Sequence, residues 1–425
     1  MTEAQIKALG PALADFLDQF LFCCGYTQTF ELLGVYCHGL LSDLDRKTCE
    51  PIALAAGVAV RTLQEFLRDH LWDHDQVRQL LQGHVAQRLA QVADDGLGSV
   101  GLADETGTVK KGSDTPGVQR QYCGEVGKIE NCIVTVHLGV ARAGYKTLLD
   151  ADLFLPQSWS HDRPRCRQAG IPDRVVYRPK WQISLEQLDR ATGHGLRLDW
   201  MTFDEGYGSK PGYLRGLENR QVRYVGEVPK SFRCCGRRPD GRQRSSRADE
   251  LVRHSPLFYQ QAWQVVRLNR QTLGPVAWHV QAAQVYWPWD RTRTYWLIWA
   301  VNRHTGEEKY FVSNAPADAA LATLLRVGFS RWNVEHSFRV SKSEIGLRHY
   351  EGRNYQGLMR HLVLCQLMLT FVADQTERLR GEKSGGDAGA GVSGREQPLL
   401  GLAGSVAGDD TVAVHGAGHR LSPAA

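Results

Sequence analysis

The sequence of 425 residues predicts a mixed α/β protein, because its pattern changes three times along the chain. Apolar residues recur at helical spacing over residues 1–95. From residue 96 onwards, short apolar runs typical of strands alternate with a helical segment. Over residues 206–315 strand patterns follow one another, and helical patterns return over residues 316–378. We therefore expect a helical N-terminal domain, an α/β core in two parts (96–205 and 316–378), and a β-rich block (206–315) between them.

Charge is distributed unevenly over these segments. Residues 1–95 carry 7 basic and 13 acidic side chains, whereas residues 96–380 carry 41 basic and 28 acidic ones. The formal net charge of +5 therefore conceals a strongly basic middle segment. Such a field attracts a polyanion, most commonly nucleic acid, and the alternative is an ordinary solvated basic surface.

The sequence predicts neither a membrane span nor an exported protein. The apolar runs Pro51–Val60 and Leu362–Val372 are shorter than the roughly 18–20 residues that cross a bilayer. The N-terminal string MTEAQIKALG lacks the pattern of a secretory signal. Ten cysteines occur without any Cys-x-x-Cys spacing, which argues against a zinc finger and favours free buried thiols. We expect a soluble, cytoplasmic protein.

The N-terminal segment is expected to hold four or five short helices. Within it, the string CEPIALAAGVAVRTLQEFLR (Cys49–Arg68) has the pattern of a helix-turn-helix, with small residues on the first helix and a second helix starting near Val60. Gly57 would form the turn. The acidic charge of this segment argues against a large footprint on DNA phosphates, so contact with DNA here stays open.

The core and the inserted block are predicted from apolar runs bounded by turn residues. In the core the expected strands are Ser99–Ala103, Asn131–Gly139, Lys146–Leu155 and Leu196–Phe203, with a helix at Ser184–Thr192. In the block they are Gln221–Val228, Ala262–Leu268, Val276–Val285, Thr294–Val301 and Lys309–Asn314. Helices are expected again at Asp318–Lys342 and Tyr355–Glu377. Residues 379–425 are rich in glycine and are expected to be disordered.

The inserted block also combines basic and aromatic residues. Its basic stretch comprises Lys230, Arg233, Arg237, Arg238, Arg242, Arg244 and Arg247, and its aromatic cluster comprises Tyr286, Trp287, Trp289, Tyr295, Trp296 and Trp299. This combination is typical of a nucleic-acid surface. The alternative is a solvated arginine loop beside tryptophans that belong to the core of a sheet.

Three acidic residues stand where they can meet at one edge of a sheet. Asp104 and Asp204 each follow a predicted strand, and Glu335 lies in a predicted helix. Carboxylates in this arrangement can hold two Mg²⁺ ions about 3.5–4 Å apart for in-line attack on a phosphodiester. The alternative for the two aspartates is a capped turn. On the helix, Arg331, Glu335, Arg339 and Lys342 form one stripe, while Val327, Val334, Phe338 and Ser341 form another.

These residues lie in longer strings that resemble bacterial insertion-sequence transposases of the Asp-Asp-Glu (DDE) class. The strings are LADETGTVKKG, PGVQRQYCGEVGKIENC, SWSHDRPRCRQAGIP, WMTFDEGYG and RWNVEHSF…SKSEIGLRHYEGRNY, in the order of the family. The resemblance covers about residues 30–375. It implies an RNase H-like core interrupted by a β-rich insertion, with a helical N-terminal domain.

The resemblance also assigns roles to individual residues. It implies that Asp104, Asp204 and Glu335 are the catalytic carboxylates and the ligands of two Mg²⁺ or Mn²⁺ ions. Relatives carry a Tyr-x2-Arg-x3-Glu-x6-Lys signature, and here Arg331, Glu335 and Lys342 match its last three positions. The tyrosine position is Gly328, a departure that puts the contact of that tyrosine with DNA in doubt. Further candidates for DNA contact are Arg339, Lys110 and Lys111, and Trp287, Trp289 or Trp296 for a flipped base.

The implied activity is cut-and-paste transposition. It comprises nicking at terminal inverted repeats, release of the ends through a hairpin intermediate as in better-known relatives, and joining of 3′-hydroxyls to target DNA. A homodimer on paired DNA ends and association with the nucleoid are expected from this activity. Two alternatives stay open: a catalytically inactive relative that binds element ends as a repressor, and an RNase H-like nuclease without strand transfer.

Overall fold

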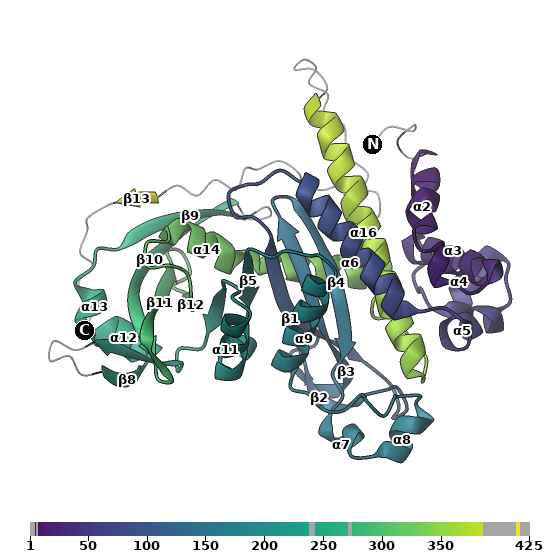
Figure 1. Cartoon of the computed structure of the whole chain (residues 1–425), viewed down its shortest axis with the longest axis horizontal. Helices are drawn as coiled ribbons and strands as arrows, with labels where there is room; N and C mark the ends of the chain where they lie inside the picture. The colour runs from purple at the N-terminus through teal and green to yellow at the C-terminus, as the bar shows by residue number, and fades with distance from the viewer. Residues whose placement is uncertain (1–4, 6, 238–242, 271–273, 386–413, 417–425) are drawn as a thin grey trace. The chain divides into compact units, whose positions relative to one another are not determined.

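The computed structural model describes residues 5, 7–237, 243–270, 274–385 and 414–416, and the chain divides into two compact units. The first unit comprises Met1–Asp94, Ala103–Arg197 and Asn333–Gly404. The second unit comprises Asp95–Leu102, Leu198–Trp332 and Ser405–Ala425. Each unit contains helices and strands (Figure 1), so the predicted mixed α/β class is confirmed.

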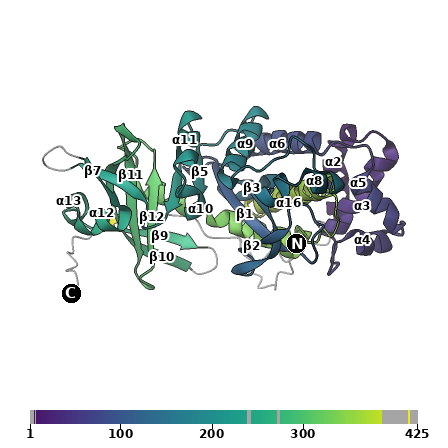
Figure 2. The same ribbon diagram turned by 90° about the horizontal axis from the view of Figure 1, so that it is seen from below.

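The described part of the N-terminal segment is helical, as predicted. It comprises α2 (Leu9–Asp18), the 3-10 turn η1 (Leu21–Cys23), α3 (Thr27–Leu41), α4 (Cys49–Ala56), α5 (Val60–Arg68) and α6 (His74–Gln91). Helices α3, α4 and α5 lie together beside the long helix α16 (Tyr355–Gly385) in Figures 1 and 2. Gly57 ends α4 with φ +67°, a backbone conformation that glycine adopts without steric cost. The predicted helix-turn-helix of α4 and α5 is therefore present as a structural element.

Arg360, on α16 (Tyr355–Gly385), fixes the end of α5. Its side chain is only 1% exposed, and its guanidinium stacks on the Trp72 ring at 4.5 Å. It donates hydrogen bonds to the carbonyl oxygens of Phe66 (3.2 Å), Leu67 (3.2 Å), His70 (2.8 Å) and Trp72. Carbonyl groups at the end of a helix lack helical partners and favour a cation. The helix-turn-helix is thus anchored to α16 within the first unit.

A five-stranded sheet has the order β2-β3-β1-β5, and β4 pairs with β3. Its strands are β1 (Val100–Val109), β2 (Gln119–Cys123), β3 (Lys128–Arg142), β4 (Tyr145–Leu153) and β5 (Trp200–Phe203). Strand β3 is antiparallel to β2 through the pairs Gln119↔Cys132 to Cys123↔Lys128, and to β4 through Thr135↔Leu153 to Arg142↔Tyr145. The sequence did not predict β2, because its string QRQYC has no apolar run. Helices α7 (Gln157–Ser160), α8 (Arg163–Gln168) and α9 (Lys180–Gly193) follow β4.

The second unit contains the predicted strand-rich block. Its helices are α10 (Glu205–Gly208), α11 (Pro211–Asn219), α12 (Ala248–His254), α13 (Pro256–Tyr259) and α14 (Leu321–Ser330). Its strands are β6 (Val225–Val228), β7 (Arg233–Arg237), β8 (Gln243–Arg247), β9 (Gln264–Arg270), β10 (Gly274–Trp287), β11 (Asp290–Asn302), β12 (Glu308–Ser313) and β13 (Val414–Gly416). They form a sheet of order β13-β9-β10-β11-β12-β6, in which β7 pairs with β10 and with β8. Strands β9, β10, β11 and β12 overlap the last four strands that the sequence predicts for the block.

The C-terminal helices differ in detail from the prediction. The single helix expected at Asp318–Lys342 consists of α14, α15 (Trp332–Val340) and the π-helical turn η2 (Ser341–Ile345). Helix α16 extends to Gly385, beyond the predicted end at Glu377. Most of the tail expected to be disordered, residues 386–413 and 417–425, lies outside the described residues.

Helix α16 is long and apolar enough, by length and composition, to cross a membrane over Tyr355–Gly381. However, 83% of its apolar window is buried inside the protein. Burial of this extent is typical of a core helix.

Strand β4 carries two buried aspartates that bind cations from two helices. Asp150 has no exposed surface, and Arg190 of α9 donates to its Oδ2 at 2.9 Å and also to Asp152. Arg78 of α6 lies 3.5 Å from Asp150. Burial raises the pKa of Asp150, although the two arginines oppose this shift. For Asp152 burial also favours a higher pKa, but the arginines outweigh it and the pKa is lowered. This cluster therefore ties both α6 and α9 to β4.

Replacement of Arg190 with methionine keeps the aliphatic part of the side chain and removes its charge. We expect R190M to lower the free energy of unfolding by about 3–5 kcal/mol, because a buried carboxylate loses its partner. Urea denaturation followed by circular dichroism measures this loss. The matched control is Arg61→Met, which breaks an exposed pair with Glu65 and should change the stability little. An equally small loss in R190M would contradict the role of the cluster.

Candidate active site

The predicted carboxylates are divided between the two units. Asp104 and Glu335 belong to the first unit, and Asp204 belongs to the second. Asp104 lies in β1, half-buried, and its Oδ1 accepts a hydrogen bond from the main-chain N–H of Glu105 at 2.8 Å. The next carboxylate, Glu105, accepts from Lys180 of α9 at 2.6 Å. Successive strand residues point to opposite faces, so Asp104 and Glu105 lie on opposite faces of β1.

Asp204 follows β5 and forms the N-cap of α10. Its Oδ1 accepts a hydrogen bond from the main-chain N–H of Tyr207 at 3.2 Å. Asp204 therefore caps a turn, which is the alternative role that the sequence suggested for it. A carboxylate has lone pairs for further partners, and capping is compatible with binding a cation. Other acids lie near it: burial and the charges of Glu227 and Asp204 raise the pKa of Glu205.

The helix with Glu335 has the two faces that the sequence predicts. Glu335, in the first turn of α15, and Arg339 are exposed, whereas Val334, Phe338 and Ser341 are buried. Arg331 lies in the second unit, at the end of α14.

Lys342 lies in η2, half-buried, within the electrostatic reach of Asp104. Burial lowers the pKa of Lys342, and the negative charges of Glu125 and Asp104 oppose this shift. Glu125, in the turn between β2 and β3, also pairs with Arg348 at 3.2 Å. Asp104, Lys342 and this turn therefore belong to one electrostatic environment.

Lys110 and Lys111 differ from each other. Lys110 donates to the carbonyl oxygens of Arg348 (3.3 Å) and Tyr350, and burial lowers its pKa to about 8. Its ammonium group thus stabilises the segment after η2. This role differs from the DNA contact that the sequence suggested and from the alternative of a solvated loop. Lys111 is exposed and stays a candidate for DNA contact.

Trp287 is a core residue, contrary to its predicted use on a DNA surface. It has no exposed surface, and its ring stacks on Tyr295 at 4.3 Å, so protein occupies its surroundings. Trp289 and Trp296 are partly exposed. The Trp296 Nε1–H donates to the carbonyl of Pro316 at 3.0 Å, and Arg215 lies 5.4 Å from the centre of the Trp289 ring.

The basic stretch is not a simple loop. Its described part forms the antiparallel strands β7 and β8, paired from Arg233↔Arg247 to Arg237↔Gln243. Arg233 donates to the Ser245 carbonyl at 2.9 Å, and Arg247 pairs with Asp249 at 2.8 Å. Arg238 and Arg242 lie outside the described residues.

Gly328, at the tyrosine position of the signature, is packed against the sheet of the second unit. A Cβ atom there would lie 3.1 Å from the Phe311 ring and 3.2 Å from Val225. The neighbouring Phe329 packs on Trp278, with ring centres 4.8 Å apart. A tyrosine at position 328 would therefore require these neighbours to move, which gives the departure a physical reason.

The donor set of Asp104, Asp204 and Glu335 fits a hard divalent cation, since carboxylate oxygens are the ligands such ions prefer. Among the residues that the structure describes, no three His, Cys, Asp or Glu side chains are arranged as a metal site. That the three carboxylates bind a common cation is therefore a proposal, which is made below.

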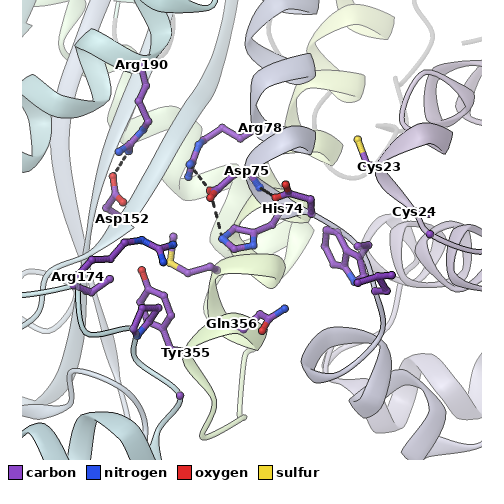
Figure 3. A pocket seen from close by; sticks show the side chains of 18 of the residues that line it. Cys23, Cys24, His74, Asp75, Arg78, Asp152, Arg174, Arg190, Tyr355 and Gln356 are labelled. Carbon is purple, nitrogen blue, oxygen red and sulfur yellow. Dashed lines mark hydrogen bonds and ion pairs between the residues drawn. The ribbon is translucent and has the colours of Figure 1, made fainter.

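A cavity of about 760 Å³ in the first unit contains none of the predicted site residues (Figure 3). Around it, Arg190 pairs with Asp152, and Asp75 pairs with Arg78 and with His74. The sequence analysis missed this cluster, because its members come from segments far apart in the chain. The available signal was the pair of aspartates at 150 and 152, two positions apart in an apolar strand.

Comparison with known proteins identifies the family to which the chain belongs. Residues 19–285, more than half of the chain, match a model described as DDE superfamily endonuclease. The chain is also similar to a "probable transposase for insertion sequence element IS701" from Microchaete diplosiphon, with 32% identity over 201 residues. This similarity covers 47% of the chain and 48% of the relative, so it spans about half the length of each.

The environment of Lys342 yields a prediction. Replacement of Glu125 with glutamine removes the anion that most opposes the effect of burial, so the pKa of Lys342 should fall further. Asp104→Asn should act in the same direction. NMR titration of the lysine side chains measures both changes. The control is Glu130→Gln, on the same hairpin, whose carboxylate pairs with Lys128. An unchanged or higher pKa in Glu125→Gln would contradict this description.

Proposed function

Because the chain belongs to the DDE superfamily endonucleases, we propose that it is an insertion-sequence transposase that cuts DNA at the ends of its element and joins the 3′-hydroxyls to target DNA. The observation that carries the proposal is the family match over residues 19–285, which include Asp104 and Asp204. Glu335 lies beyond the matched residues and is supported by its place on the exposed face of α15. The substrate is double-stranded DNA, including terminal inverted repeats, and the enzyme acts at the nucleoid.

In this proposal Asp104, Asp204 and Glu335 together hold two Mg²⁺ or Mn²⁺ ions. Bound divalent cations supply Lewis acidity for in-line displacement at a phosphodiester. The protein itself orients the carboxylates: β1 positions Asp104, the N-terminus of α10 positions Asp204, and the buried face of α15 fixes the exposure of Glu335.

Cations near these carboxylates bind the DNA backbone. Lys342 is the strongest candidate, because it shares the environment of Asp104. Arg331, Arg339 and Lys111 supply further positive charge, and Trp289 or Trp296 can stack on an unpaired base. Two DNA ends require two such sites, so we propose a homodimer in the complex with paired ends.

A nicking assay with DNA that carries the ends of the element and with Mg²⁺ tests this proposal. We expect Asp104→Asn, Asp204→Asn and Glu335→Gln each to lower the rate about 1,000-fold or more, because each removes a ligand charge from a cooperating set. Binding of end DNA, measured by mobility shift, should persist. The matched control is Asp114→Asn, which alters an exposed pair with Arg353 close to Asp104 in sequence.

The products of the wild-type protein separate the alternatives. Joined 3′ ends support transposition, and a hairpin at the flanking or element end supports a hairpin route. Broken DNA without joining would show a nuclease, and binding without any nick would show an inactive end-binding protein. Normal nicking by one of the three variants would remove that residue from the catalytic set.

Helix α5 is the second element that we propose contacts DNA. Arg61, Gln64 and Arg68 are exposed on it, at positions that share one helical face. The two arginines are 84% and 58% exposed in their side chains, and each has only an exposed acidic partner, Glu65 or Asp69. Such pairs contribute little and can be exchanged for phosphate contacts.

Replacement of Arg61 or Arg68 with alanine should weaken binding of end DNA and reduce its dependence on salt. Each lost phosphate contact lowers the slope of log affinity against log salt by about 1. Fluorescence anisotropy at several salt concentrations measures this slope. Arg253→Ala, which alters an exposed pair with Glu308 on another unit, serves as the control. An unchanged slope in both α5 variants would remove this helix from the DNA interface.

A further inference from the structure

Lys47 is a buried cation in the loop between α3 and α4. Its side chain is only 3% exposed. Its Nζ donates to the carbonyl oxygen of Leu40 at 2.8 Å and to the carbonyl oxygen of Glu344. Leu40 lies in the last turn of the preceding helix, and Glu344 lies in η2, almost 300 residues later in the chain. Lys47 thus joins the ends of two helices that are remote in sequence.

The main chain of the same loop makes a second contact with this region. The N–H of Lys47 donates to Nδ1 of His349 at 3.0 Å. Gly346, which ends η2 with φ +88°, lies against Lys47, and a Cβ atom on it would be 2.9 Å from the Cβ of Lys47. The approach therefore requires glycine both for its backbone conformation and for space.

His361 of α16 holds the next residues. Its Nε2 lies 3.2 Å from the Gly346 carbonyl and 3.3 Å from the Leu347 carbonyl, and its Nδ1 lies 2.9 Å from the hydroxyl of Tyr36 on α3. All of these groups are buried. We call Lys47, Tyr36 and His361 the helix-end cluster, because together they bind the chain where η2 ends.

The helix that ends at this cluster carries the residues assigned to chemistry. Helix α15 begins with Glu335 in its first turn and continues into η2, which contains Lys342. Helices with a π-turn are often functional, because the extra residue changes the direction of the side chains around it. Lys342, whose charge interacts with that of Asp104, lies in η2, so its placement depends on where η2 ends.

We propose that Lys47 is a positioning residue for catalysis, which fixes the end of the α15–η2 helix and thereby the placement of Lys342 and Glu335. The assignment rests on the proposed function of these two residues. Packing alone does not explain a lysine here, since a methionine would fill similar space without burying an ammonium group. The ammonium group instead binds carbonyl oxygens at a helix terminus, where the helix dipole favours a cation.

The test uses the full-length protein with Lys47→Met and Lys47→Arg. We expect Lys47→Met to lower the single-turnover nicking rate about 10- to 100-fold at saturating DNA, as expected for misplacement by about 1 Å. The affinity for end DNA should fall much less than the rate, because Lys342 is one of several proposed contacts with the DNA backbone. Lys47→Arg keeps the positive charge and the donors, and should restore most of the rate.

A measurement independent of activity is hydrogen exchange of the main-chain amides. Lys47→Met should accelerate exchange over residues 341–349 and leave α5 unchanged. Tyr36→Phe, which removes a single hydroxyl, should accelerate exchange in the same region and serves where Lys47→Met folds poorly. The matched control is Arg46→Met, which breaks an exposed pair with Glu351 next to Lys47.

The outcomes separate this inference from the proposed function. Unchanged exchange over residues 341–349 in both Lys47→Met and Tyr36→Phe would overturn the clamping of the helix end. Faster exchange with an unchanged nicking rate would overturn its role in catalysis. Equal losses of DNA affinity and rate, without rescue by Lys47→Arg, would overturn positioning in favour of a general loss of structure. If the wild-type protein does not nick DNA, the proposed function fails, whatever the exchange shows.

Discussion

Two carboxylates on a strand that is buried on both faces constrain how helices pack in the first unit. Asp150 and Asp152 can remain ionised inside the protein only if cations reach them, and these come from Arg190 on α9 and Arg78 on α6. The helices that pack on β4 must therefore carry these arginines. An apolar helix in place of α6 or α9 would leave carboxylate charge on β4 with less compensation. Strand β4 in turn pairs with β3, which lies beside β1, the strand that carries Asp104.

The same unit binds the ends of helices with buried side chains. Arg360 binds the carbonyl groups at the end of α5, and Lys47 and His361 bind those at the end of η2. Arg360 and His361 are consecutive residues of α16, so one turn of this core helix contacts both the helix-turn-helix and the segment after Lys342. The helix-turn-helix, which is expected to recognise DNA, and the helix that carries Glu335 therefore both depend on contacts with α16.

The sequence predicted most elements that depend on periodicity, and it missed those that depend on distant partners. The two faces of α15 and the turn at Gly57 follow from spacing alone. Strand β2 was missed because its exposed, polar residues form no apolar run. Trp287 was one of three candidates for contact with a flipped base, with packing in the core of a sheet as the alternative, because an aromatic residue in a strand has the same pattern in either place. The buried contacts of Lys47 and Lys110 gave no local signal, since each includes a carbonyl oxygen about 240 to 300 residues away in sequence.

The contacts of the helix-end cluster with main-chain atoms have a consequence for sequence divergence. Lys47 binds the carbonyl oxygen of Glu344 and not its carboxylate, and His361 likewise binds main-chain oxygens of residues 346 and 347. The hydrogen bonds themselves therefore do not depend on which side chains stand at positions 344 and 347. Position 346, in contrast, is restricted by its positive φ and by the nearby Cβ of Lys47. A motif search based on side chains would overlook this arrangement in a divergent protein that retains it.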